Sequence, residues 1–263
     1  MKKSLKILLI IVIILLIIAG CFVFALKQST PQIEKKKQPI HTVQKKEHIP
    51  VTTKDGNSLL VHKGQKVHQK GWATFTLKDI YTVQKHFVIS NMDIYVKKIK
   101  WIELNDLTDK ASDYLYSYTG TSLQSLFEEG YKANNLQEAN DIVERSKWKI
   151  DKNVVYLDIT YTIKNRNKKE VQFFSMVNVL GDDFYFHVPS QNFISSEDTF
   201  MGTTDASRID YQPGELRKGE IGLILGDKLP SIPNEIHFKT APLLDGESHE
   251  LIHKAKAFTI NIK

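Results

Sequence analysis

Apolar and polar residues alternate with a period of two over much of the chain beyond residue 58. Between residues 155 and 163 the odd positions are Val, Leu, Ile, Tyr and Ile, while Asp158, Thr160 and Thr162 occupy the other face. This pattern predicts a half-buried strand with its polar face in solvent. Similar alternation over residues 72–77, 221–225 and 258–262 predicts further strands, and Gly, Asp and Pro between them supply turns. Together these signals favour a β-sandwich of short strands.

Two segments refine this prediction. The polar run at residues 165–170 separates the strand at 155–163 from an apolar stretch at 171–179, which predicts a hairpin. From residue 121 to 145 the spacing changes, because Leu123, Leu126 and Phe127, and then Leu136 and Ala139, recur at helical intervals. We therefore expect a helical insertion near residues 111–147 in an otherwise β domain.

The N-terminal segment predicts a membrane association. Residues 7–26 are all apolar or small, and 20 residues at a rise of about 1.5 Å span roughly the 30 Å hydrocarbon core of a bilayer. Lys2, Lys3 and Lys6 precede this segment, as in a secretory signal, which favours a cytoplasmic N-terminus and an exported remainder. The lysines at 27 and 35–37 would support the reverse topology if charge alone were counted.

Three fates of this segment stay open. Residues 18–21, Ile-Ala-Gly-Cys, resemble the lipobox of bacterial lipoproteins, so Cys21 is a candidate for lipidation. The apolar run continues to Leu26, as an uncleaved anchor requires. Cleavage after Ala25 would release the protein. In the first two cases the chain contacts membrane lipid through this segment.

Composition and charge narrow the function classes. The chain has 263 residues, a net charge of +6 and one cysteine. Four of the six net charges come from the Lys-, Gln- and Pro-rich stretch at 27–57, which predicts a flexible basic stalk rather than a nucleic-acid-binding face. A single cysteine excludes an internal disulfide and a cysteine-based zinc site. The predicted organisation is a signal segment at 1–26, a stalk at 27–57 and an extracytoplasmic domain at 58–263.

The strand at 154–165 and a later Pro-Gly-Glu segment carry a family resemblance. Residues 154–165 end in an Asn-containing turn, and Pro213-Gly214-Glu215 leads into an apolar strand. Over roughly residues 91–263 the chain resembles a family of immunoglobulin-like domains of Gram-positive lipoproteins, named after an immunoprotective extracellular antigen. The resemblance implies an immunoglobulin-like β-sandwich outside the membrane, with no catalytic residues to carry over.

The sequence offers one catalytic motif. His249-Glu250-Leu251-Ile252-His253 fits the zinc-protease pattern, in which two histidines one helical turn apart bind the metal and the glutamate acts as general base. Such a site needs a helix and a third ligand, whereas residues 254–263 contain no His, Asp or Glu. The Asp245-Gly246 turn before the motif and the alternation after it predict a hairpin. We expect no metal or other cofactor, and keep a surface zinc metallohydrolase as the alternative function.

Two further groups of side chains bear on binding. Acidic residues at 182–183, 197–198, 205 and 210 lie in loop-like stretches, but their spacing matches no calcium loop, so we expect solvated carboxylates. Tyr114, Tyr116 and Tyr118 would share one face if their stretch is extended, and tyrosine is a frequent anchor at interfaces. The main hypothesis is a membrane-anchored, non-enzymatic domain of a Gram-positive bacterium. It would bind a protein or cell-envelope component through these tyrosines.

Overall fold

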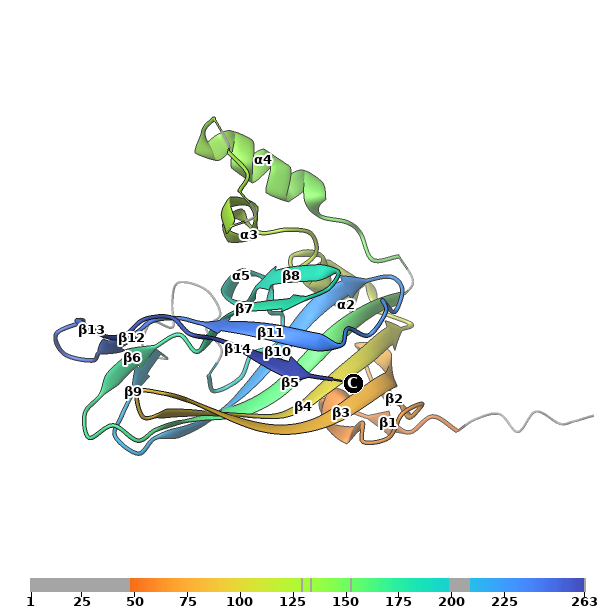
Figure 1. Cartoon of the computed structure of the whole chain (residues 1–263). Coiled ribbons are helices and arrows are strands. Elements are labelled where there is room, and N and C mark those ends of the chain that lie inside the picture. Colours follow the sequence, from red (N-terminus) through yellow and green to blue (C-terminus); the bar gives the residue numbers. More distant parts are fainter. Residues whose placement is uncertain (1–47, 129, 133, 152, 199–208, 263) are drawn as a thin grey trace, which may run out of the picture. The chain divides into compact units, whose positions relative to one another are not determined.

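A sheet of six strands forms the larger layer of the fold (Figure 1). The computed structural model describes residues 48–128, 130–132, 134–151, 153–198 and 209–262. β1 and β2 pair in parallel, and all other neighbours in this sheet are antiparallel. In spatial order the strands are β1 (Val51–Thr52), β2 (Lys66–Gln69), β3 (Ala73–Ile89), β4 (Met92–Asn105), β5 (Asn153–Asn165) and β10 (Leu216–Gly226).

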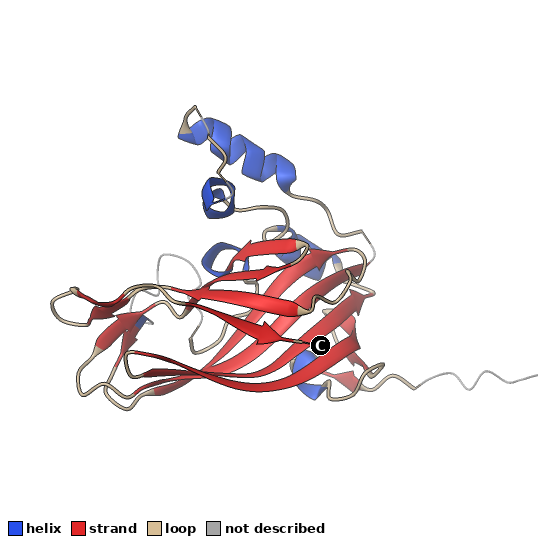
Figure 2. Cartoon of the chain, viewed as in Figure 1, coloured by secondary structure: helices blue, strands red, loops and turns tan. Residues whose placement is uncertain are grey.

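Two smaller sheets complete a mainly β fold (Figure 2), as the alternating pattern predicts. One has the order β14 (Ala257–Asn261), β11 (Glu235–Thr240), β7 (Met176–Gly181) and β8 (Phe184–His187). The other has the order β13 (Leu251–His253), β12 (Leu243–Asp245), β6 (Val171–Phe173) and β9 (Asp210–Tyr211).

The main core lies between the six-stranded sheet and the two smaller sheets. Odd-numbered residues of β5 and β10, such as Leu157 and Ile221, pack in one cluster with Trp101 of β4, Phe173 of β6 and Phe238 of β11. All five are at most 1% exposed. Period-two alternation places Leu157 and Ile221 on one face of the six-stranded sheet, which is the face that the sequence predicts to be buried.

The opposite face of the same sheet is also covered at one end. Even-numbered residues of these strands, including Ile102, Tyr156 and Ile224, form a second apolar cluster. Leu60, which follows the short 3₁₀ helix η1 (Asn57–Leu59), and Leu115 pack onto them. Because both faces are buried at this end, the simple division into an apolar face and a solvent face fails for β5.

The remaining helices are α2 (Asp109–Tyr116), α3 (Leu123–Glu128), α4 (Leu136–Ser146) and α5 (Val188–Gln191). Thr108 begins α2, since its hydroxyl accepts a hydrogen bond from the amide of Ala111, and Asn135 begins α4 by accepting from the amide of Glu138. In Figure 1, α3 and α4 lie next to each other beyond β8. In the described part of the chain, no helix combines the length and apolar character that a bilayer crossing needs.

The predicted hairpin between residues 155–163 and 171–179 is wrong. β5 pairs with β4 and β10, whereas β6 pairs with β12 and β9 in another sheet. The side-chain amide of Asn165 donates to the carbonyl groups of Lys169 (3.1 Å) and Tyr211 (2.9 Å), which holds the chain where it crosses between layers. Ser175, with a φ of 55°, then separates β6 from β7.

The predicted stalk is too long at its C-terminal end. The folded unit begins at His48, since Val51 and Thr52 pair with β2, and Asn57 is buried at 3% exposure. Backbone pairing and side-chain hydrogen bonds order this polar stretch although it contains few apolar residues. The predicted membrane segment at 1–26, Cys21 and the stalk up to residue 47 lie outside the described residues.

Candidate functional site

Charged side chains continue the second face of the six-stranded sheet beyond its apolar cluster. Lys100 on β4 is paired directly with Asp158 on β5, and Gly222 is paired with Asp158 from β10 on the other side. Glu220 lies two residues before Gly222 and is therefore a diagonal neighbour of Asp158 on the same face. Strand register alone thus brings one lysine and two carboxyl groups together.

Asn57 connects these charges to one another. The Lys100 ammonium group donates to the backbone carbonyl and to the side-chain Oδ1 of Asn57, both at 3.1 Å, and lies 3.6 Å from Asp158 Oδ2. The amide Nδ2 of Asn57 donates to Glu220 Oε1 at 2.7 Å. Lys100 is 5% exposed and Asp158 is fully buried, so this is an ion pair in the interior of the protein.

Burial and like charge keep a proton in this cluster. Burial raises the pKa of Asp158 above its usual range, although Lys100 opposes the shift. Burial, and then the neighbouring carboxylates of Asp158 and Asp55, raise the pKa of Glu220 to about 8. Two adjacent carboxyl groups that share one neighbouring lysine do not both ionise readily at neutral pH. Glu220 is therefore the group that holds the proton at pH 7.

A hollow of about 550 Å³ opens above Glu220, and we call it the acidic hollow. Its size falls within the range of small-molecule binding pockets. Aromatic rings form its walls, in edge-to-face pairs: Trp72 with Tyr114 (5.6 Å between centroids) and Tyr156 with Phe193 (5.0 Å). The lining residues are Asp55, Asn57, Gln69, Trp72, Phe75, Lys110, Tyr114, Tyr156, Phe193, Ile194, Ser195 and Glu220.

Tyr156 is a buried tyrosine in the lining of the hollow. The residue is 1% exposed, and its ring packs against Phe193. Burial raises the pKa of Tyr156 well above its usual range, and Asp158, Asp55 and Glu220 raise it further. Its place in the lining makes Tyr156 a candidate contact for a ligand.

Residues 192–198 build one side of the hollow by lying along the edge of β10. The side chain of Asn192 accepts from the amide of Gly222 at 2.7 Å, and the amide of Phe193 donates to the Gly222 carbonyl at 3.1 Å. A Cβ atom at Gly222 would lie 2.6 Å from the side chain of Ile194. The absence of a side chain at 222 is therefore what allows Phe193 and Ile194 to approach the sheet.

Comparison with known proteins finds structures similar to this chain, but the two given below have no stated function. No family model and no curated protein matches the chain. A solved structure of a functionally unknown protein from Listeria monocytogenes EGD-e is 12% identical, over 71% of this chain and 86% of that chain, with a TM-score of 0.39. A conserved hypothetical protein from Bacillus anthracis is 13% identical, over 66% of this chain and 96% of that chain, with a TM-score of 0.31. Neither description states an activity or a ligand.

Tyr114, Tyr116 and Tyr118 would share one face in an extended stretch, and this condition is not met, because the first two lie in helix α2. Tyr114 and Tyr118 are four residues apart, and the centroids of their rings lie 5.3 Å from each other. Tyr114 also donates to the carbonyl of Phe193 at 2.7 Å and lines the acidic hollow. Tyr116 does not line it, although the two residues are similarly exposed, at 37% and 39%. The period-two spacing of the tyrosines resembles a strand, but Thr108 begins a helix just before them.

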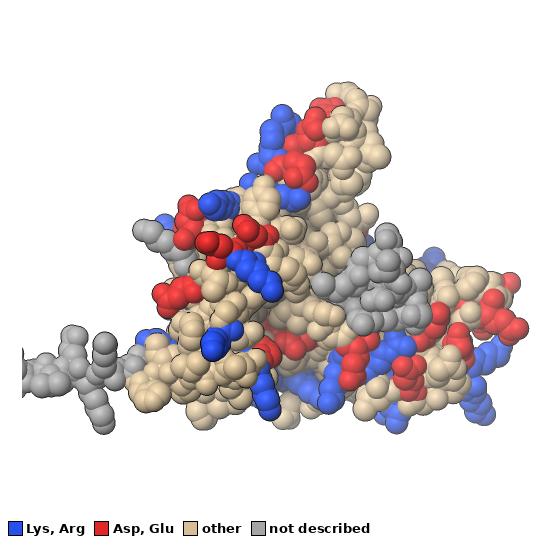
Figure 3. All heavy atoms as spheres, turned by 180° about the vertical axis from the view of Figure 1, so that it is seen from behind, with Lys and Arg blue, Asp and Glu red and all other residues tan. Residues whose placement is uncertain are grey.

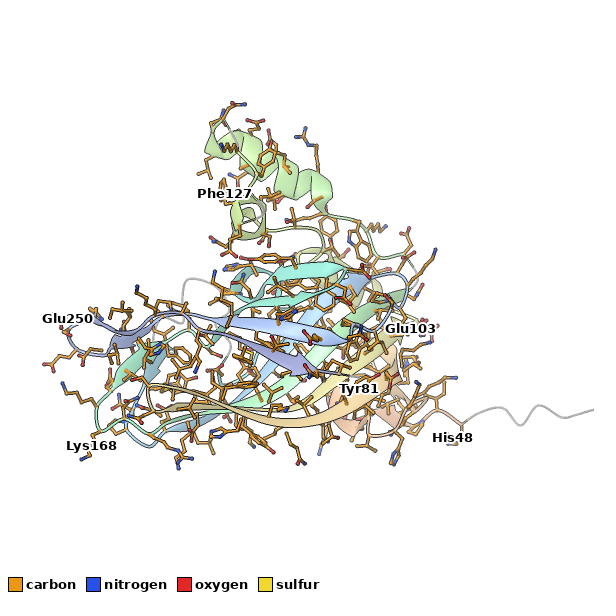
Figure 4. The ribbon with its side chains drawn as sticks, in the orientation of Figure 1. His48, Tyr81, Glu103, Phe127, Lys168 and Glu250 are labelled. Atoms are coloured by element: carbon orange, nitrogen blue, oxygen red, sulfur yellow. The ribbon has the colours of Figure 1, made fainter. Side chains whose placement is uncertain are left out.

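The zinc motif lies in a turn and a strand. His249 has a φ of 58° and its amide donates to the carbonyl of Asp245, while His253 ends β13. The ring nitrogen Nδ1 of His249 contacts Gln172 at 3.0 Å. Figure 4 labels Glu250 at the end of this hairpin. Two histidines on a turn and a strand do not have the one-turn helical spacing that the motif requires, and no cluster suited to a metal ion occurs among the described residues.

Asp158 and Asp198 were both expected to be solvated and are both buried. The hydroxyl of Tyr161 donates to Asp198 at 2.6 Å, and burial raises the pKa of Asp198 to about 7. Asp205 lies outside the described residues. A local pattern shows only that Asp158 shares a face with threonines. The segments that cover Asp158 are residues 57–60 and 192–198, and both are distant from it in sequence.

Proposed function

We propose that the protein is a membrane-tethered, extracytoplasmic binding domain whose small ligand occupies the acidic hollow. The observation that carries this proposal is an aromatic-walled hollow whose lining includes Glu220, a carboxyl group that Asn57 connects to the buried pair of Lys100 and Asp158. Concave sites with apolar walls and a few polar groups are the usual form of ligand pockets. Buried groups of strongly shifted pKa in such a site add support.

The accessible chemistry favours binding rather than acid–base catalysis. Glu220 lines the hollow, but its partner Asp158 is fully buried and does not line it. A pair in which only one carboxyl group can meet a ligand suits recognition, whereas hydrolytic pairs need both groups at the reacting bond. The zinc alternative has no comparable support, because its motif lies in a hairpin.

Location and fold family form the second part of the proposal. The apolar segment at 7–26 would hold the domain at the outer face of the cell membrane of a Gram-positive bacterium. The two-layer packing of antiparallel strands is compatible with a divergent immunoglobulin-like sandwich. Protease treatment of intact protoplasts tests the topology, since a C-terminal tag outside the cell would be removed. Protection of the tag until lysis would contradict an external domain.

A matched pair of tyrosine variants tests the hollow. Tyr114→Ala removes one wall, while Tyr116→Ala removes a similarly exposed side chain of the same helix outside the hollow. The full-length chain in mild detergent would be screened by ligand-observed NMR against small sugars, amines and amino acids. We expect hits whose affinity falls about tenfold in Tyr114→Ala, as for a binding anchor worth more than about 1 kcal/mol, and is unchanged in Tyr116→Ala. The absence of any hit that depends on Tyr114 would refute the hollow as a ligand site.

A further inference from the structure

The acidic hollow has more carboxyl groups than buried cations. Asp55, Asp158 and Glu220 contribute three carboxyl groups, and Lys100 is the one buried cation that contacts them among the described residues. Lys110 also lines the hollow, but it is exposed on helix α2. The acidic hollow therefore holds a proton on Glu220 in place of a second buried cation. A ligand that supplies this charge would be bound electrostatically.

The walls favour the same chemistry. Trp72, Tyr114 and Phe193 present aromatic rings around the hollow, and the negative face of an aromatic ring attracts organic cations. Tyr156, which is 1% exposed, also lines the hollow, and a tyrosine oxygen can accept a hydrogen bond from an ammonium group. On the face drawn in Figure 3, acidic and basic side chains are interspersed, so selectivity for charge has to come from this local arrangement.

We propose that the acidic hollow binds an organic ammonium group, as an amine or quaternary ammonium carried by a small molecule. This inference rests on the proposed function and specifies its ligand. An inorganic metal ion fits less well, because the carboxyl groups are not gathered as a metal cluster within the described ranges. An anion would add a further negative charge beside Glu220 and Asp55. A neutral sugar remains a different outcome of the test.

Binding of a cation would be coupled to proton release. Glu220 on β10 is faced by Asp158 from β5, Lys100 from β4, and Asp55 and Asn57 from the segment before β2. A cation in the hollow favours the ionised form of Glu220, whose pKa without ligand is about 8. As the pH is raised towards 7, the affinity for a permanent cation should therefore increase about tenfold with each pH unit. It should level off near pH 9.

Calorimetry on the full-length chain would compare three cations with neutral partners of similar shape. The pairs are choline with 3,3-dimethyl-1-butanol, n-butylamine with n-butanol, and glucosamine with glucose. We expect at least one cation to bind tenfold or more tightly than its partner. Titration of choline at pH 7 in two buffers of different ionisation enthalpy should show release of up to one proton per ligand.

Two variants connect these effects to named groups. Glu220→Gln can still accept the hydrogen bond from Asn57, and we expect it to bind the preferred cation at least tenfold more weakly and without dependence on pH. Glu144→Gln, on the exposed surface of α4, is the matched control and should behave as the wild type. Tyr156→Phe should also weaken cation binding.

The outcomes separate the two proposals. If neutral partners bind as tightly as cations, and Tyr114→Ala weakens them, the hollow is a ligand site but the ammonium inference is wrong. The same conclusion follows if choline binding shows no proton release and no change in Glu220→Gln. If none of the six compounds binds while other fragments do so in a Tyr114-dependent manner, the inference is again overturned and the proposed function stands.

Discussion

Removing Lys100 should cost much more stability than neutralising Asp158. Lys100→Met removes the ion pair and two hydrogen bonds to Asn57, and it leaves Asp158 without a buried counter-ion. Breaking a buried pair in this way typically costs about 3–5 kcal/mol of the free energy of unfolding. Burial is the main cause of the raised pKa of Glu220 and the charge of Asp158 adds to it, so Asp158→Asn removes part of the shift. Glu220 then ionises and replaces Asp158 as the partner of Lys100, so we expect a cost of about 1–2 kcal/mol.

Urea unfolding of the full-length chain at pH 7, followed by tryptophan fluorescence, would measure these costs. The exposed Lys110→Met is the control and should change the free energy of unfolding by less than about 0.5 kcal/mol. The double variant Lys100→Met/Asp158→Asn should be more stable than Lys100→Met alone. In the double variant, positions 100, 158 and 220 are all neutral once Glu220 is protonated. Equal costs for the two single variants would refute exchange of the counter-ion, and a negligible cost for Lys100→Met would refute the buried pair itself.

Other predictions concern protonation, packing and the N-terminus. Glu220 and Asp198 have pKa values of about 8 and 7 in the folded protein, both above their unfolded values. Their contribution to stability is therefore complete below about pH 4 and is lost as the pH rises to 8, so urea unfolding should show a decrease on the order of a few kcal/mol between pH 5 and pH 8. A flat profile would contradict both shifts. Gly222→Ala should cost about 1–3 kcal/mol in the same assay and weaken ligands of the hollow, because its Cβ would displace Ile194; unchanged binding would contradict this account. Elemental analysis should find no stoichiometric zinc despite the motif at 249–253, and the mass of the N-terminal peptide should distinguish an intact anchor from lipidated Cys21 or cleavage.

Sequence patterns predict one face of the main strands well and the second face poorly. The odd positions of β5 and β10 are buried as the alternation predicts, because they meet the other layer along the whole strand. The even positions near Asp158 and Tyr156 are covered only where residues 57–60, α2 and residues 192–198 happen to cross them. A period-two pattern records which side chains share a face, but it carries no information about distant segments that pack on it.

The same limit applies to the candidate site. The sequence indicates Tyr114 as a binding residue for the case of an extended stretch, whereas its position in the hollow depends on helix α2. Glu220 and Lys100 gave no local signal, because a single charged residue in a strand usually faces solvent. Their proximity follows from strand register across β4, β5 and β10, and register cannot be deduced from one strand at a time.

The segment at 192–198 has a consequence for self-association. β10 is an outer strand of the six-stranded sheet, and exposed outer strands are templates for intermolecular pairing and aggregation. Asn192, Ser196 and Glu197 occupy three of its backbone amides with side-chain oxygens, at Gly222, Glu220 and Lys218 respectively. The chain that shapes the ligand site therefore also shields the sheet. Substitutions that detach it should produce oligomers and loss of ligand together, which links the solubility of the protein to the integrity of its binding site.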